Sequence, residues 1–177
     1  MGDSSWLNNR LSHPDYNNWV KGNLILLELK TGLVPFLDEK AKVLQQHVLS
    51  HVAAPGTVCT VCTEVDLRKK KYICPSAGIC TTALNVINTE YTHHPSGTVK
   101  LMNTNNQAWC DTAQYWEMAK AYISTPGYAS KTSAAETDCA GLLTIILNCK
   151  WIQSLLSVSL GVFQKVRVYS LLLFYTC

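Results

Sequence analysis

The chain has 177 residues, of which 47% are hydrophobic and 15% charged, with a formal net charge of +3. This composition excludes an intrinsically disordered chain, and the length suits one domain with a sizeable core. The mild net charge gives no reason to expect nucleic acid or an anionic membrane, since polyanion binders usually concentrate basic residues on one face. The sequence is therefore that of one folded domain.

Helical spacing of apolar residues predicts a short helix over residues 5–11 and a second helix that starts at the Ser-His-Pro-Asp cap of residues 12–15. Trp19 and the apolar run of residues 24–27 are expected in the core. Gly and Pro at positions 32 and 35 should end this helix, and residues 36–52 form a third.

Residues 57–107 differ from the rest, because helical periodicity is lost and four of the eight cysteines lie here. We expect a long irregular insert with at most short strands near residues 58–61 and 98–102. A loop of this length in a compact domain is uncommon unless it is functional, held by a metal or disordered.

The insert carries a candidate zinc site. Cys59 and Cys62 have the two-residue separation with which two thiolates bind one side of a tetrahedral zinc ion. The candidate ligands are Cys59, Cys62, Cys74, Cys80, His93 and His94. The alternative is a loop with ordinary reduced thiols, since five residues separate the second cysteine pair and adjacent histidines cannot easily face one metal. Zinc is the only cofactor that the pattern suggests.

A basic run lies in the same insert and consists of Arg68, Lys69, Lys70 and Lys71. Such a run could contact RNA phosphates. The alternative is a solvated loop with no binding role. The run has no glycine-rich support and no interleaved aromatic residue other than Tyr72, and this favours the alternative.

Two helices and a turn are expected over residues 109–147. Asp111 with Gln114 has the form of a capping box at the first helix, and Ser133 with Glu136 repeats that form at the second. The second helix is apolar nearly all round, which places it in the middle of a bundle.

A last core helix should follow residue 147. Residues 141–163 are long enough to span a bilayer, but Asn148, Lys150 and Gln153 lie near the midpoint. Lysine alone costs about 2.5–3.5 kcal/mol at the centre of a membrane helix. The sequence therefore favours a core helix and no membrane partner.

Residues 1–10 are polar and lack a signal-peptide run, which predicts a cytoplasmic or nuclear protein that is not secreted. In such a compartment the cysteines are expected as thiols or metal ligands rather than disulfides. No nucleophile elbow, P-loop, dinucleotide fingerprint or His-Glu-x-x-His motif occurs, so no enzyme is predicted.

Three sequence segments carry a resemblance to a known family. In chain order they are residues 16–21, Trp109 with residues 116–121, and residues 136–140 leading into a leucine pair. They resemble the uncharacterised protein family named after chromosome X open reading frame thirty-eight. That family is similar to the HEPN-like helical domain of a DAZ-interacting RING ubiquitin ligase, which implies an all-α fold.

HEPN domains often carry an Arg-x-x-x-x-His motif that acts on RNA, but none of the three arginines here has His five positions later. No catalytic residue is carried over. The resemblance ends after Arg167, where we expect a truncated product with a divergent apolar tail over residues 168–177.

The sequence thus predicts a mainly α, HEPN-like helical bundle over residues 5–167 with an irregular Cys/His-containing insert over residues 57–107. The predicted function is a non-catalytic intracellular protein-interaction module with an unidentified protein partner. The alternative is an RNA-binding or RNA-processing HEPN-type domain whose catalytic motif is absent. Nothing in the sequence indicates whether the chain forms homo-oligomers.

Overall fold

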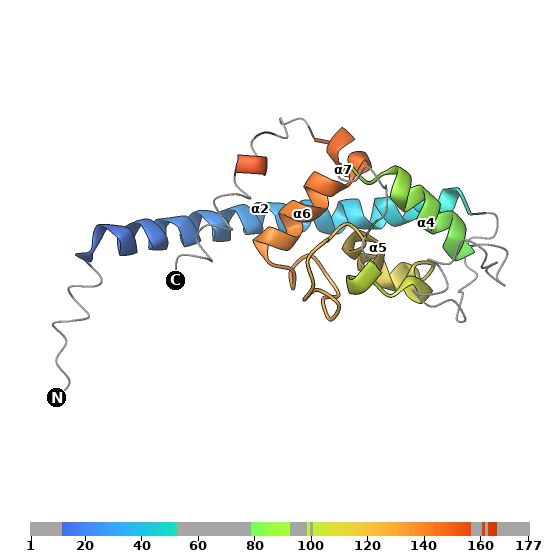
Figure 1. Ribbon diagram of the computed structural model, residues 1–177, viewed down its shortest axis with the longest axis horizontal. Helices are drawn as coiled ribbons and strands as arrows, with labels where there is room; N and C mark the ends of the chain where they lie inside the picture. Colours follow the sequence, from blue (N-terminus) through green and yellow to red (C-terminus); the bar gives the residue numbers. More distant parts are fainter. Residues whose placement is uncertain are drawn as a thin grey trace.

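The computed structural model describes residues 12–52, 79–92, 99, 101–156, 161 and 163–165, and within these residues the chain is helical with no strand (Figure 1). The prediction of a mainly α fold is confirmed. The helices are α2 (Pro14–Ser50), α4 (Ile79–Thr89), α5 (Trp116–Lys120), α6 (Cys139–Asn148) and α7 (Lys150–Ser154), with short 3₁₀ helices η1 (Leu101–Asn103), η2 (Asn106–Ala108) and η3 (Thr112–Gln114).

Helix α2 is continuous over 37 residues, so the prediction of two helices divided at Gly32 and Pro35 is wrong. Pro35 lies inside the helix, although proline costs about 3 kcal/mol in a helix interior. The flanking Leu33 and Leu37 are both buried, and burying one leucine side chain contributes about 1.5–3 kcal/mol. Packing of this face therefore offsets the lost backbone hydrogen bond.

The other helices pack around α2, which contacts α4, α5, α6 and α7. In Figure 1 these helices gather along the C-terminal part of α2, whereas its N-terminal part, drawn in blue, extends beyond them. The buried stripe that α2 contributes to the core follows helical spacing and consists of Leu26, Leu33, Leu37, Ala41, Leu44 and Val48. The core thus lies along only part of the longest helix.

Helix α6 crosses α2 in the middle of the bundle, and every residue of α6 except Ala140 is buried. This confirms the central position predicted for an apolar helix. Its start was predicted wrongly, because Asp138 caps it by accepting a 2.8 Å hydrogen bond from the amide of Gly141. Glu136 instead accepts hydrogen bonds from the amide and hydroxyl of Thr132, which fixes the preceding turn.

The helix predicted from Asp111 is shorter than expected. Asp111 caps η3 by accepting from the amide of Ala113, and the α-helical part is only the five residues of α5. The side-chain amide of Asn103 donates to the carbonyls of Ile123 and Thr125 at 2.9 and 2.7 Å. The chain bends after α5 at these carbonyls.

Part of the predicted irregular insert is helical, which corrects the expectation for residues 79–89. In α4 the residues at helical spacing are buried, namely Cys80, Ala83, Leu84 and Ile87. In the sequence, the Thr and Asn residues of this segment make the helical spacing of its apolar residues hard to detect. The η1 helix replaces the strand expected near residue 101, and the one expected at residues 58–61 lies outside the described residues.

Helices α6 and α7 are separated at Cys149, whose backbone is extended and forms an isolated antiparallel bridge with Tyr91. The amide of Lys150 donates to the carbonyl of Glu90 at 2.8 Å, and the amide of Thr92 donates to that of Asn148 at 3.0 Å. Helix α7, which follows this bridge, is five residues long. Within the described part of the chain, no helix has the length and apolar character needed to cross a membrane.

Candidate functional site

Of the six candidate zinc ligands, the structure describes Cys80, which lies in the first turn of α4 with 2% of its surface exposed. The described residues contain no group of three or more metal-ligating side chains. The zinc site therefore stays a prediction. The remaining candidates and the basic run lie outside the described residues: Cys59, Cys62, Cys74, His93, His94, Arg68, Lys69, Lys70 and Lys71.

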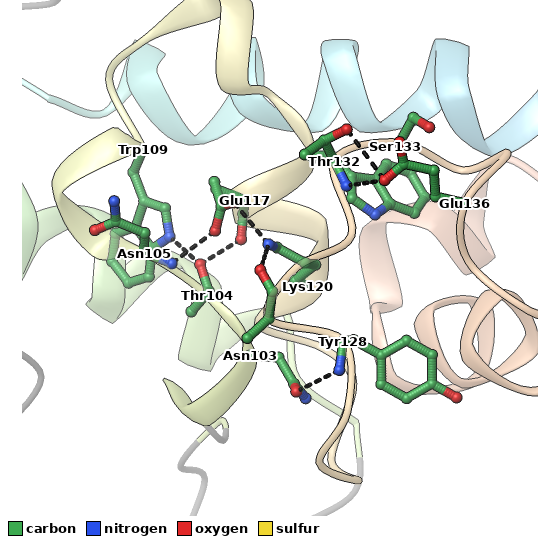
Figure 2. A network of polar contacts seen from close by, with 12 residues as sticks. Asn103, Thr104, Asn105, Trp109, Glu117, Lys120, Tyr128, Thr132, Ser133 and Glu136 are labelled. Carbon is green, nitrogen blue, oxygen red and sulfur yellow. Dashed lines mark hydrogen bonds and ion pairs between the residues drawn. The ribbon is translucent and has the colours of Figure 1, made fainter.

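A polar network surrounds the fully buried side chain of Lys120 (Figure 2). Its ammonium group donates to a carboxylate oxygen of Glu117 at 2.6 Å and to the carbonyl of Ala129 at 2.9 Å. The other carboxylate oxygen of Glu117 accepts from the amide of Asn105 at 2.6 Å. Both charges are thus compensated, as a buried ion pair requires.

The network continues into the segment that contains η1 and η2. The Thr104 hydroxyl donates to the carbonyl of Glu117 and accepts from the indole nitrogen of Trp109, the latter at 2.8 Å. The side-chain oxygen of Asn103 accepts from the amide of Tyr128 at 3.1 Å. Figure 2 shows how these contacts join loops from both sides of α5. These groups hold loop backbone in place, so we assign the network a structural role.

Cys139 and Cys149 carry buried free thiols. Burial raises the pKa of the Cys149 thiol to about 12, and burial together with the charge of Asp138 raises that of Cys139 to about 11. The thiolate is the reactive form of cysteine. Both thiols therefore stay protonated at neutral pH, which makes them poor nucleophiles.

Titratable and aromatic side chains also meet where α2, the end of α4 and α7 come together. The His47 ring stacks on Trp151 with 5.3 Å between ring centroids, and its Nε2 lies 3.7 Å from a carboxylate oxygen of Glu90. The ring of His51 lies edge-on to His47 at 5.0 Å. These contacts join three helical segments.

The most distinctive surface lies on the N-terminal part of α2. Five of the eight large hydrophobic residues that are exposed in the described chain occur there, with exposed fractions from 36% to 64%. We call this set the α2 N-terminal surface: Tyr16, Trp19, Leu24, Ile25 and Leu27. Exposed apolar side chains that gather on one element indicate an interaction site, whereas scattered ones are ordinary.

This surface corrects the core assignment made from sequence. Trp19 was expected in the core but is 38% exposed, and of the four residues 24–27 only Leu26 is buried. Trp19, Leu26 and Leu33 follow one another at intervals of seven, so they lie on one face of α2. That face continues past the helices that cover it, and Trp19 stacks on Tyr16 with 5.9 Å between ring centroids.

The sequence did contain a signal for this surface. Apolar residues surround the helix between positions 24 and 27, a pattern read as complete burial. The same pattern arises when one apolar face of a helix packs in the core of its own domain and another apolar face binds a partner. Periodicity alone does not separate these two cases.

The family described as Domain of unknown function (DUF4559) matches residues 10–169. The chain is 28% identical over 144 residues to the protein named "Uncharacterized protein CXorf38 homolog" from Mus musculus, which covers 79% of this chain and 43% of that protein. The chain thus spans less than half the length of this relative. No solved structure matches the chain significantly. The chain belongs to the family described as Domain of unknown function (DUF4559).

Proposed function

We propose that this domain is a non-catalytic protein-interaction module that contacts its partner through the α2 N-terminal surface. The observation that carries the proposal is the gathering of exposed apolar side chains on one helix that extends beyond its neighbours. Covering apolar surface contributes about 25 cal/mol per Å². A partner that covers this helix would therefore gain binding energy from residues that now face water.

The chemistry of the surface suits a protein partner. Trp and Tyr are enriched among the residues that dominate protein interfaces, and Trp19 and Tyr16 form a stacked pair at one end of the surface. Leu24 and Leu27 continue it at helical spacing, a pattern by which amphipathic helices dock onto apolar partners.

The rest of the described chain supports the non-catalytic part of the proposal. The Lys120–Glu117 pair is enclosed in structural contacts, and the Cys139 and Cys149 thiols are protonated at neutral pH. We further infer a HEPN-like bundle, which the order of the three family segments in the sequence supports.

Site-specific photocrosslinking in cells tests the proposed function. A photoreactive amino acid at Leu27, which is 60% exposed, should form a discrete crosslinked protein species. The matched control position is Met102, a large apolar residue outside α2 that is 46% exposed on η1. Crosslinks at neither position, or equal crosslinks at both, would contradict an interaction site on α2.

A further inference from the structure

We propose that the outer face of α2, formed by Lys21, Leu24, Ile25 and Glu28, binds a second copy of this chain. The two α2 helices are antiparallel around a two-fold axis between Leu24 and Ile25. The inference rests on the proposed function, because it names the partner for Leu24 and Ile25, two residues of the α2 N-terminal surface. It is carried by the order of charged and apolar residues along the outer side of α2.

Four exposed residues form a stripe on this outer side. Lys21, Leu24, Ile25 and Glu28 occupy positions i, i+3, i+4 and i+7, so they lie on one face of the helix. The face points away from the buried stripe that includes Leu33. Leu24 and Ile25 are 55% and 64% exposed, and the two charges flank them about 10 Å apart at 1.5 Å of rise per residue.

The stripe is complementary to itself. A point halfway between Leu24 and Ile25 is also halfway between Lys21 and Glu28. A two-fold axis through that point places Lys21 of each copy opposite Glu28 of the other, and Leu24 opposite Ile25. In such an interface the same patch serves both subunits, and each contact occurs twice.

The charges select this arrangement over the alternatives. In a parallel pair in register, Lys21 would face Lys21 and Glu28 would face Glu28, so like charges would meet twice. The antiparallel pair replaces both repulsions with ion pairs that flank an apolar centre. A second copy of the chain presents the complementary negative and positive charges at this spacing by symmetry.

Sedimentation velocity of the full chain tests the inference. We expect a concentration-dependent equilibrium between the 19.6 kDa chain and a species of twice that mass. Lys21→Glu and Glu28→Lys should each weaken dimerisation about tenfold, since each replaces two attractions with two repulsions. The double variant Lys21→Glu/Glu28→Lys should restore wild-type association, because the ion pairs return with their signs exchanged.

Apolar variants give a second measurement. Ile25→Glu should abolish the dimer by placing a charge beside the axis, whereas the control Val43→Glu, at an exposed position of the same helix, should leave it unchanged. Circular dichroism checks that each variant folds. A wild-type chain that is monomeric at every concentration, or a charge-exchanged double variant that fails to recover, would overturn the pairing. A monomeric chain that still crosslinks to a different protein through Leu27 would reject self-pairing and leave the proposed function standing.

Discussion

Two helical glycines differ in their surroundings. At Gly32 in α2, an added Cβ atom would meet nothing within 4 Å apart from its chain neighbours and the backbone of its own helix. At Gly141 in α6, it would lie 2.5 Å from a ring carbon of Tyr128 and 2.7 Å from the methyl group of Thr137. Gly141 is therefore required for close packing of α6, whereas Gly32 is not required by any close contact.

We expect Gly32→Ala to raise the free energy of unfolding by about 0.5–1 kcal/mol, because alanine loses less backbone entropy in a helix. Gly141→Ala, the same change in α6, should lower it by about 1–3 kcal/mol, as overpacking does. Urea unfolding followed by circular dichroism measures both. Stabilisation by both substitutions would show that Tyr128 and Thr137 move aside at no cost.

At this scale the sequence predicted local chemistry better than exposure. The capping box predicted at Asp111 and Gln114 forms in part: Asp111 is a cap, but of η3 through the amide of Ala113, and the side chain of Gln114 donates a 2.8 Å hydrogen bond to the Asp111 carboxylate. The prediction of a capping box at Ser133 and Glu136 is wrong, because Asp138 caps α6. Trp19 was misplaced because its exposure depends on where distant helices end, which its neighbours in the sequence do not encode.

Helix α5 contains an ion pair that is shielded from solvent. Both partners of the Lys120–Glu117 pair have low exposure, 0% and 13%. A second ion pair on α2, between Lys42 and Asp38, is more exposed at 52% and 31%. Exposed pairs contribute about 0–1 kcal/mol, whereas removing one partner of a buried pair costs about 3–5 kcal/mol.

Lys120→Ala should therefore lower the free energy of unfolding by about 3–5 kcal/mol, because Glu117 and the carbonyl of Ala129 lose their shared donor. Lys42→Ala is the matched control and should cost less than about 1 kcal/mol. Chemical denaturation of the two variants checks the difference. Equal losses would mean that the Lys120 network contributes no more than a surface contact.

Helix α6 was predicted from the sequence, whereas the continuity of α2 and the presence of α4 were not. The difference has a physical reason. The apolar character of α6 is local, so its existence and position were evident from the sequence. The continuity of α2 through Pro35 depends on leucines buried by other helices, and propensity rules do not include that contribution. Helix α4 was missed although its apolar residues keep helical spacing, because polar residues of low helix propensity lie between them.

For the whole molecule, the mainly α architecture was predictable, but the candidate interaction surface was not. The surface exists because α2 is longer than the bundle that packs on it, and this difference in length is a property of the assembled fold. The zinc hypothesis concerns a part of the chain outside the described residues, so it stays a prediction from cysteine spacing.

We expect about one zinc ion per chain in purified, reduced protein, and its loss in Cys59→Ser, since the thiolate pair of Cys59 and Cys62 would supply half of a tetrahedral shell. Inductively coupled plasma mass spectrometry measures the metal content. Cys139→Ser is the control, because Cys139 is buried in α6 and should not affect metal binding. Absence of zinc in the wild-type chain would reduce the cysteine pair to ordinary thiols.

The length of α2 also has a consequence for how this helix forms. Starting a helix is unfavourable and extending one is easy, so isolated helices shorter than about 12–15 residues are marginal in water. The turns around Leu37 and Leu44 are fixed by tertiary packing and can provide the nucleus. The turns around Trp19 and Leu24 gain their order by propagation from that nucleus. The packed C-terminal part of α2 thus maintains the helical conformation of its N-terminal part.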